Sequence, residues 1–316
     1  MKAVAHTFQD IELPKPSPAG RDLLVKVEAI SVNPVDYKQR KVDSPTPRVL
    51  GWDAAGTVEA VGPHATLFKP GEAVYYAGDV TRPGCNSEFH LVDERIVGRK
   101  PKKLDFAQAA AMPLTSITAW EAYFERMKVQ PGRRILIING AGGVGSIGIQ
   151  IAKAAGLHVT ATASRPESIA WVRSLGADEV VDHRKPLLPQ AKPVDYVANF
   201  SGELDAYWEA MAELVAPQGA VVAIVANQKP LSMDTIRAKS ATVCWELMFT
   251  RPRFKTPDMI EQHRLLNKVA DWLDEGKLRC TLKETLSPIS GANLRKAHER
   301  LESGKMIGKL VLKGWS

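Results

Sequence analysis

The segment that most constrains the fold is a glycine-rich turn between an apolar run and a helical pattern. Residues 134–139 are typical of a buried strand, and residues 144–155 are typical of a helix. The glycines between them have the spacing G-x-G-x-x-G, which here gives a tight turn, close approach to a pyrophosphate and close helix packing. Because the helix N-terminus also presents free N–H groups to phosphates, the pattern predicts a dinucleotide site, against the alternative of a turn without a ligand. The residues predicted to contact the dinucleotide are Gly140, Gly142, Gly143, Val144 and Gly145.

The strand that follows decides which dinucleotide is expected. Residues 157–163 form an apolar run, and Ser164 and Arg165 come directly after it. An NAD site places an Asp or Glu about 20 residues past the glycines to bind the ribose 2′-hydroxyl. A hydroxyl and a guanidinium would instead donate hydrogen bonds to a 2′-phosphate, so the sequence favours NADPH over NADH. Glu167 lies close enough to keep NADH as an alternative, and Ser164 could instead cap the next helix.

Strands and helices alternate through the middle of the chain, whereas strands dominate its first part. Residues 1 to about 112 are rich in turns and short alternating strands, which predicts a compact β-barrel domain. From about 114 the β-α-β rhythm predicts a doubly wound parallel sheet. The tail, with helices expected at 256–275 and 291–303 and a strand at 309–313, is expected to return to the first domain. The predicted strands between them are 134–139, 157–163, 179–182, 194–199, 219–225 and 240–246, and the predicted helices are 116–127, 144–155, 166–175 and 203–214.

Length and composition limit the class of protein. A chain of 316 residues can hold two domains. It has no apolar run of about 18 residues and its first residues lack a signal-peptide pattern, so we expect neither a membrane span nor export. Three cysteines, Cys85, Cys244 and Cys280, form no C-x-x-C pair, which fits a reducing cytoplasm. The net charge of +7 would attract phosphorylated cofactors, but there is no basic stripe, so nucleic acid is not an expected partner.

Five segments carry a resemblance to a known family. They are residues 32–37, 50–56, 114–119, 140–145 and 248–253. With them, the chain resembles the medium-chain dehydrogenase/reductase superfamily along its whole length, within it the quinone oxidoreductase-like branch, and within that bacterial zinc-type alcohol dehydrogenase-like proteins. The resemblance implies a Rossmann NADP-binding domain of residues 115–252, inserted into a GroES-like catalytic β-barrel domain of residues 1–114 and 253–316. It also implies a cleft between the domains for the chemistry, and a homodimer.

The zinc in that family's name can be tested on the residues. The zinc-dependent relatives hold a Cys in the segment that matches residues 33–36 and a His-Glu pair in the segment that matches residues 51–56. Here those segments contain Asn33 and Trp52, and neither side chain is a normal zinc ligand. The structural zinc lobe of those relatives needs four closely spaced cysteines, and the chain has three, far apart. We therefore expect no metal site, and alcohol oxidation is disfavoured because it needs a Lewis acid to ionise the alcohol.

Hydride delivery from NADPH then needs an acceptor that is already electrophilic. Quinones and α,β-unsaturated carbonyls meet this condition, and charge would develop on a carbonyl oxygen, where a hydrogen-bond donor stabilises the transition state. The resemblance places Asn33 near the nicotinamide and substrate, where its amide would donate to that oxygen; the alternative is a turn-forming residue before Pro34. Tyr37 is predicted to donate or relay a proton. Lys38, which stands where the relatives often have a tyrosine, is predicted to hold a carbonyl or a phosphate.

Further cofactor contacts are expected from the segment that enters the second domain and from its fifth strand. Thr115 and Thr118 are expected to contact the nicotinamide ribose or its phosphate; the alternative is that they cap a helix. Val225 is expected to lie beside the nicotinamide. The sequence thus predicts a zinc-independent, NADPH-dependent reductase of small-molecule quinones or enones. Two alternatives stay open: a reductase of another carbonyl class, and a non-catalytic NADPH-binding sensor or structural protein.

Overall fold

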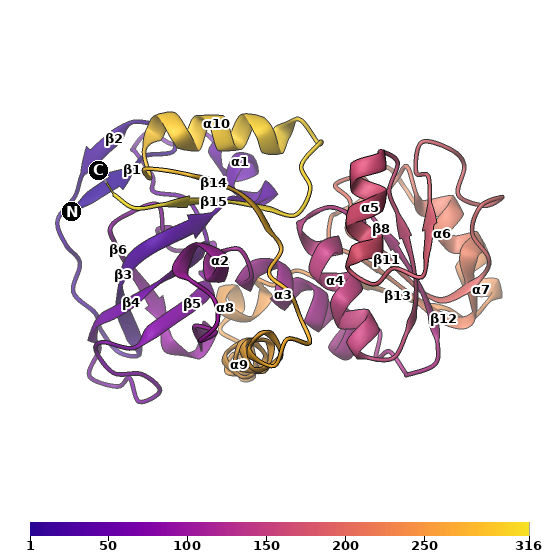
Figure 1. Cartoon of the computed structure of the whole chain (residues 1–316), viewed down its shortest axis with the longest axis horizontal. Helices are drawn as coiled ribbons and strands as arrows, with labels where there is room; N and C mark the ends of the chain where they lie inside the picture. The colour runs from indigo at the N-terminus through magenta and orange to yellow at the C-terminus, as the bar shows by residue number, and fades with distance from the viewer. Residues whose placement is uncertain (316) are drawn as a thin grey trace. The chain divides into compact units, whose positions relative to one another are not determined.

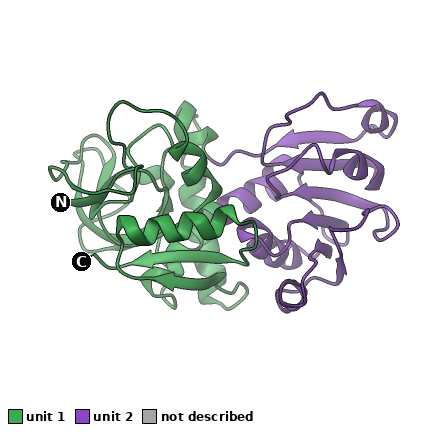
Figure 2. Ribbon diagram, turned by 90° about the horizontal axis from the view of Figure 1, so that it is seen from above, with its two compact units in different colours: residues 1–114, 249–316 green, residues 115–248 purple. Residues whose placement is uncertain are grey.

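The chain divides into two compact units, which Figure 2 shows in different colours. The computed structural model describes residues 1–315. Unit 1 contains Met1–Leu114 and Phe249–Ser316, and unit 2 contains Thr115–Met248. Each unit has its own sheet, and the sheet of unit 2 is parallel throughout. The expected fold class, a parallel α/β unit inserted into a β-rich unit, is therefore confirmed.

Unit 1 is built on a seven-stranded sheet with the order β14-β15-β3-β4-β5-β7, in which β6 also pairs with β3 (Figure 1). Strand β15 comes from the end of the chain and pairs antiparallel with β3, with Val311 opposite Ser31. Strands β3 and β4 approach closely at Gly56, where a Cβ would lie 2.1 Å from the backbone oxygen of Lys26. The strands are β1 (Lys2–Val4), β2 (Asp10–Glu12), β3 (Asp22–Ser31), β4 (Asp53–Val61), β5 (Ala73–Ala77), β6 (Phe89–Asp93), β7 (Val97–Arg99), β14 (Leu282–Leu286) and β15 (Lys309–Lys313).

Helices join and cover the strands of unit 1. The longest, α9, buries Leu266, Val269 and Leu273 at helical spacing, as the sequence predicts. The prediction that this helix begins at Thr256 is wrong, because Lys255 adopts a left-handed conformation that ends the short helix α8, and turns separate it from α9. The helices are α1 (Pro34–Arg40), η1 (Glu94–Ile96), α2 (Phe106–Ala110), α8 (Thr250–Phe254), α9 (Glu261–Asp274) and α10 (Gly291–Glu302).

Unit 2 is a six-stranded parallel sheet with the order β10-β9-β8-β11-β12-β13. Helices α4 and α5 cover one face and α6 and α7 the other (Figure 1), so the sheet is doubly wound. Its strands read as nearly continuous apolar runs because both faces are buried. The elements are β8 (Arg134–Ile138), α4 (Gly143–Ala154), β9 (His158–Thr162), α5 (Pro166–Ser174), β10 (Glu179–Val181), β11 (Val194–Asn199), α6 (Trp208–Leu214), β12 (Val215–Ala223), α7 (Asp234–Ala238) and β13 (Thr242–Trp245).

Some element ends differ from those predicted. The helix expected at 203–214 begins only at Trp208, because the Asn199 side chain accepts the Ser201 N–H at 2.9 Å and holds a turn instead. The strand expected at 219–225 already ends at Ala223, so Val225 lies beyond it. The helix expected from 116 to 127 is α3 (Pro113–Trp120), which continues as a π-helix, η2 (Glu121–Arg126).

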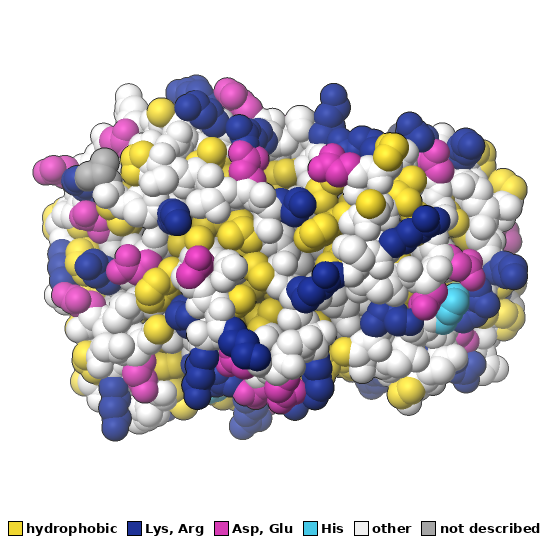
Figure 3. Space-filling view, in the orientation of Figure 1, with side chains coloured by type: hydrophobic (Ala, Val, Ile, Leu, Met, Phe, Trp, Pro, Cys, Tyr) yellow, Lys and Arg dark blue, Asp and Glu magenta, His cyan; other side chains and the backbone are white. Residues whose placement is uncertain are grey.

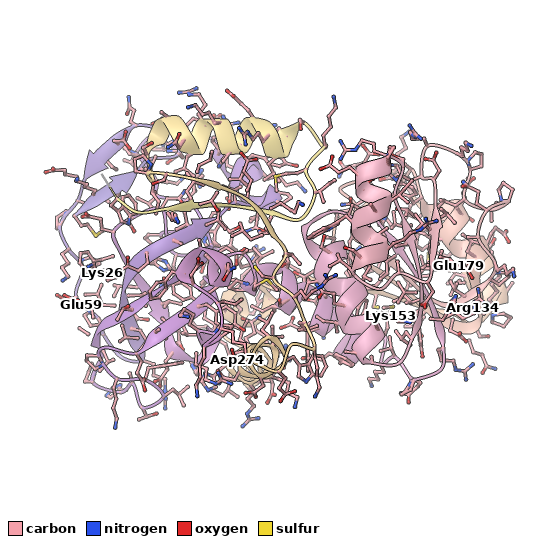
Figure 4. All side chains as sticks on the ribbon, in the orientation of Figure 1. Lys26, Glu59, Arg134, Lys153, Glu179 and Asp274 are labelled. Atoms are coloured by element: carbon pink, nitrogen blue, oxygen red, sulfur yellow. The ribbon has the colours of Figure 1, made fainter. Side chains whose placement is uncertain are left out.

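The surface carries charges of both signs. On the face that Figure 3 shows, Lys and Arg side chains are scattered among acidic ones. Ion pairs join separate elements, such as Arg134 of β8 with Glu179 of β10, the two strands on either side of β9; both residues are labelled in Figure 4. No helix in residues 1–315 combines the length and the apolar character that crossing a membrane requires.

Candidate active site

The glycine turn of unit 2 connects β8 to α4 in a conformation that side chains would block. A Cβ on Gly145 would lie 2.2 Å from the backbone oxygen of Asn139, and one on Gly140 would lie 2.8 Å from a side chain of β9. Gly142 is the N-cap of α4 and offers no side chain to the N–H groups of the first turn, which have no acceptor within the helix. These N–H groups, on residues 143–145, have the arrangement that binds a pyrophosphate.

Beyond β9, three side chains that can donate hydrogen bonds gather. Arg165 is the N-cap residue of α5, and its N–H donates to Ser168 Oγ at 3.1 Å, so the alternative that Ser164 caps this helix is wrong. Ser164 Oγ instead lies 3.2 Å from Nε2 of His183. Burial lowers the pKa of His183 against the charge of Asp182, and the positive charges of Arg184 and Arg165 lower it further. The group therefore includes a titratable side chain that was not predicted.

His183 escaped the sequence-based prediction because it is 19 residues from Ser164 and no local spacing links the two. It follows β10, which is the parallel neighbour of β9. The carboxyl ends of parallel strands meet at one edge of a sheet, where ligands of such folds bind. This shared edge was the available signal for His183.

The other predicted cofactor residues lie in apolar or helical surroundings. Thr115 and Thr118 are inside α3 and nearly inaccessible, with 2% and 5% of their surfaces exposed. Neither is at the N-cap of the helix, so helix capping does not account for them. Val225 packs, partly buried, against the apolar core of unit 2. Their contacts with a cofactor stay predictions.

In unit 1, Asn33 belongs to a buried polar cluster. Its side-chain amide donates to Asp53 Oδ2 at 2.9 Å and, at a longer 3.4 Å, to the backbone oxygen of Ser31. Its Oδ1 accepts a hydrogen bond from Lys309 Nζ. Because an ammonium can only donate, the atom that faces Lys309 must be the amide oxygen. The predicted use of the amide as a donor to substrate therefore competes with a buried carboxylate for the same N–H.

We call this set of residues the Lys309 cluster. Asn33, Asp53 and Lys309 form its centre, and Asp36, Cys85 and the backbone N–H of Leu114 lie around them. Asp36, on the first turn of α1, accepts the Asn33 backbone N–H at 2.8 Å. Burial raises the pKa of Asp36 to about 7, against the Asn33 hydrogen bond and the charge of Lys309. Cys85 Sγ lies 3.5 Å from the backbone oxygen of Asp53, and burial raises the pKa of this thiol well above its usual range. The backbone N–H of Leu114 donates to Asp53 Oδ1 at 2.8 Å.

Tyr37 and Lys38 lie on α1, but outside the cluster. Tyr37 is half-buried, and the Lys41 ammonium lies 5.3 Å from the centre of its ring. Lys38 is exposed. Asn33 precedes α1 as its N-cap residue, in an extended conformation, and Tyr37 lies on the helix itself. The structure places Lys38 on the solvent side.

Comparison with known proteins supports one family for the whole chain. Residues 19–102 match the model described as alcohol dehydrogenase GroES-like domain, and residues 175–312 match the model described as zinc-binding dehydrogenase. A zinc-type alcohol dehydrogenase-like protein of Staphylococcus aureus (strain COL) is 44% identical over 315 residues, which is 96% of this chain and 94% of the relative. The 2-methylene-furan-3-one reductase of Solanum lycopersicum is 32% identical, over 92% of this chain and 71% of its own.

Solved structures agree along the full length. A putative zinc-dependent alcohol dehydrogenase protein from Rhizobium etli CFN 42 is 52% identical with a TM-score of 0.94, covering 100% of this chain and 98% of that one. The quinone oxidoreductase from Coxiella burnetii is 28% identical with a TM-score of 0.83, covering 100% and 99%. A mycobacterial protein complexed with NADPH is 26% identical with a TM-score of 0.85, covering 99% and 100%.

Several of these descriptions name zinc, and the residues of the Lys309 cluster do not fit it. Among residues 1–315, no group of three or more His, Cys, Asp or Glu side chains is placed to hold a metal ion. The ammonium of Lys309 lies between Asn33 and Asp53, in the two segments that match the zinc ligands of the zinc-dependent relatives. A second cation there would be repelled by the first.

Proposed function

We propose that this chain, which belongs to the medium-chain dehydrogenase/reductase superfamily, is a zinc-independent oxidoreductase that uses NADPH to reduce quinones or α,β-unsaturated carbonyls. The oxidoreductase class follows from the family. The choice of acceptor is supported by relatives described as a quinone oxidoreductase and as a furanone reductase. Both acceptors accept hydride without a metal to activate them.

The observation that carries the choice of NADPH is the group of Ser164, Arg165 and His183. The hydroxyl and the guanidinium can donate to a 2′-phosphate, and the imidazole can donate from one ring nitrogen when neutral and from both when protonated. Glu167, which left NADH open in the sequence, is exposed on the first turn of α5. A relative in complex with NADPH supports the same choice. When bound, NADPH supplies the hydride, and the chain's own residues must place and protonate the acceptor.

For the acceptor side we propose distinct roles on α1. Tyr37 is half-buried and can give a proton to the oxygen on which charge develops. Asn33, the N-cap residue before α1, is fixed by Asp53 and Lys309. Lys38 is exposed, so its proposed contact is with an anionic part of the substrate or cofactor at the surface. The proposed site of action is the cytoplasm, since Cys85, Cys244 and Cys280 are all free thiols.

The test is NADPH and NADH oxidation against a panel of benzoquinone, an alkyl enone and an aldehyde, together with oxidation of a primary alcohol by NADP, each with and without a chelator. We expect turnover with quinone or enone, a preference for NADPH and no effect of the chelator. Alcohol oxidation that the chelator abolishes would contradict the proposal. NADPH binding without turnover on any acceptor would favour a sensor or structural protein, and turnover only of the aldehyde would favour another carbonyl class.

A matched pair of variants on one helix tests the cofactor assignment. Arg165→Ala removes the proposed phosphate donor, whereas Arg173→Ala removes an exposed arginine in the last turn of α5. A charged hydrogen bond contributes about 1.5–3 kcal/mol, so we expect the NADPH dissociation constant to rise about 10- to 100-fold in Arg165→Ala only. NADH binding should not change in either variant. Equal effects of the two substitutions, or equal losses for both cofactors, would contradict the assignment.

We also propose a homodimer, in which the free edge of β13 meets that of a second copy. β13 is the last strand of the parallel sheet, and it leaves Trp245 47% and Leu247 46% exposed. An unpaired strand edge with large apolar side chains is a surface that proteins cover. Light scattering should give twice the chain mass for the wild type and a monomer for Trp245→Glu. A wild-type monomer would refute the proposal.

A further inference from the structure

Lys309 is a lysine enclosed by protein, and all of its near polar neighbours accept hydrogen bonds. Nζ donates to the backbone oxygen of Val32 at 3.0 Å, to Asn33 Oδ1, and to Asp53 Oδ2 at 3.1 Å. Only 2% of the Lys309 side chain and none of the Asp53 side chain is exposed. The three N–H bonds of an ammonium therefore meet three oxygens.

These oxygens come from separate parts of unit 1. Val32 follows β3, Asn33 is the N-cap of α1, and Asp53 begins β4, whereas Lys309 begins β15. Converging oxygens from several elements around one positive charge are the arrangement by which proteins hold a cation. Here the cation is part of the chain. Burying it is costly unless it is paired and fully hydrogen-bonded, and this geometry meets both conditions.

We infer that the ammonium of Lys309 is the built-in cation of this site, between the two segments that match the zinc-ligand segments of zinc-dependent relatives, and that it positions Asn33 and the start of α3. It holds Asn33 directly. It holds α3 through Asp53, whose other oxygen, Oδ1, accepts the N–H of Leu114. Thr115, a predicted cofactor contact, is the next residue. The consequence for catalysis rests on the proposed function, whereas the identity of the cation does not.

The charge of Lys309 also reaches Asp36. The pKa of Asp36 is raised to about 7, and burial is the main cause. The charge of Asp53 also raises this pKa, whereas the hydrogen bond from the Asn33 N–H and the charge of Lys309 lower it. The Cys85 thiol is a further titratable group that interacts with Asp36. Loss of the ammonium should therefore move the ionisation of Asp36 to higher pH. A side chain that only filled space would not produce this shift.

The experiment uses the full chain with Lys309→Met, Asp53→Asn and the double variant Lys309→Met/Asp53→Asn. Lys309→Met leaves a buried carboxylate unpaired and is expected to reduce the yield of folded protein, but the double variant removes both charges together. Lys313→Met, an exposed lysine of the same strand, is the matched control. Four quantities are measured: zinc content by mass spectrometry, melting temperature, NADPH binding, and the pH dependence of kcat with KM.

We expect wild-type protein with far less than one zinc per chain, and a double variant that melts closer to wild type than Lys309→Met does. The double variant should bind NADPH but lose kcat about 10- to 100-fold, as small misplacements of positioned groups do. Any acidic limb of the pH profile of Lys309→Met should move to higher pH, whereas in the double variant the loss of the Asp53 charge opposes this shift. Stoichiometric zinc in the wild type, or wild-type kcat in the double variant, would overturn the inference.

Failure of the proposed function gives a different result. If the wild type turns over no acceptor, kcat and its pH dependence cannot be compared between the variants. The zinc content and the melting temperatures still decide whether Lys309 is the cation. Additive losses in the two single variants, without recovery in the double variant, would then refute its pairing with Asp53.

Discussion

Each unit of the molecule buries carboxylates beside a basic side chain, but the two units differ in how deeply that basic side chain is buried and how it is hydrogen-bonded. In unit 1, Lys309 is itself buried and its ammonium contacts three oxygens. In unit 2, Glu121 and Glu246 are both buried, with Glu121 on the π-helix and Glu246 just after β13. Their basic partner, Arg126, leaves 33% of its side chain exposed and bonds Glu246 Oε2 at 2.8 Å.

The difference decides where a proton is held. Burial raises the pKa of Asp53, but every polar neighbour of its carboxylate, Lys309, Asn33 and the Leu114 N–H, is a donor. A protonated Asp53 would have no acceptor for its proton, so the ionised form fits the site. In unit 2, burial and the nearby Glu121 raise the pKa of Glu246 to about 9, against Arg126. Asp53 of unit 1 is therefore neutralised by an internal cation, and Glu246 of unit 2 by a proton.

The largest effect is expected when the internal pair of unit 1 is broken. Asp53→Asn leaves the ammonium of Lys309 without its anion, and removing one partner of a buried pair costs about 3–5 kcal/mol of unfolding free energy. Urea unfolding measures this loss. Glu59→Gln is the control, because Glu59, labelled in Figure 4, pairs with Lys15 at the surface and its loss should leave stability nearly unchanged. Equal stabilities of the two variants would contradict the comparison.

Removing the cation of unit 2 should cost less. In Arg126→Met the acid pair loses a hydrogen bond, but Glu246 can remain protonated, so we expect a loss of about 1–3 kcal/mol in urea unfolding at neutral pH. Arg133→Met removes an exposed arginine that pairs with Asp195 and serves as control. A loss as large as that of Asp53→Asn would mean that unit 2 depends on its cation as unit 1 does.

The proton held in unit 2 should make stability depend on pH. Because the folded-state pKa of Glu246 is raised from 4.5 to about 9, the folded chain binds a proton that the unfolded chain releases within this window. This contribution is fully present below pH 4.5 and is lost as pH rises through about 9. The unfolding free energy should fall by at most about 1.4 kcal/mol per pH unit in between. Glu246→Gln should flatten the slope, and an unchanged slope would place the proton elsewhere.

The smallest effect is expected in the rate of thiol labelling, which reports on local opening near each cluster. Cys85 lies against Asp53 and is completely buried, whereas Cys244 on β13 is half-buried. Burial raises the pKa of Cys244 to about 11 and raises that of Cys85 well above its usual range. Iodoacetamide should therefore modify Cys244 slowly and Cys85 only on unfolding, as peptide mass mapping can show. Faster labelling of Cys85 would show that the Lys309 cluster opens more readily than the edge of unit 2.

The sequence alone determined those features of the fold and of the cofactor site that depend on residues close together in the chain. The glycine spacing predicted the turn between β8 and α4, and the alternation of strands and helices predicted the parallel sheet. The lack of an acid directly after β9 indicated Ser164 and Arg165 as candidate phosphate-binding residues. These are local signals, since backbone conformation and periodic burial are set within a few residues. The prediction failed where a side chain stabilised a different local conformation. Asn199 accepts the Ser201 N–H and stabilises a turn, so that α6 begins later than predicted.

Only the tertiary structure decided which distant residues meet. Lys309 pairs with Asp53 from 256 positions away, because β15 adds to β3 on the side opposite β4 and all three strands share one sheet. His183 reaches Ser164 because two strands end at the same edge. A lysine in an apolar strand reads from the sequence as a surface residue. Its enclosure by three oxygens depends on the packing of β3, β4, α1 and β15, and that packing makes a buried ammonium stable.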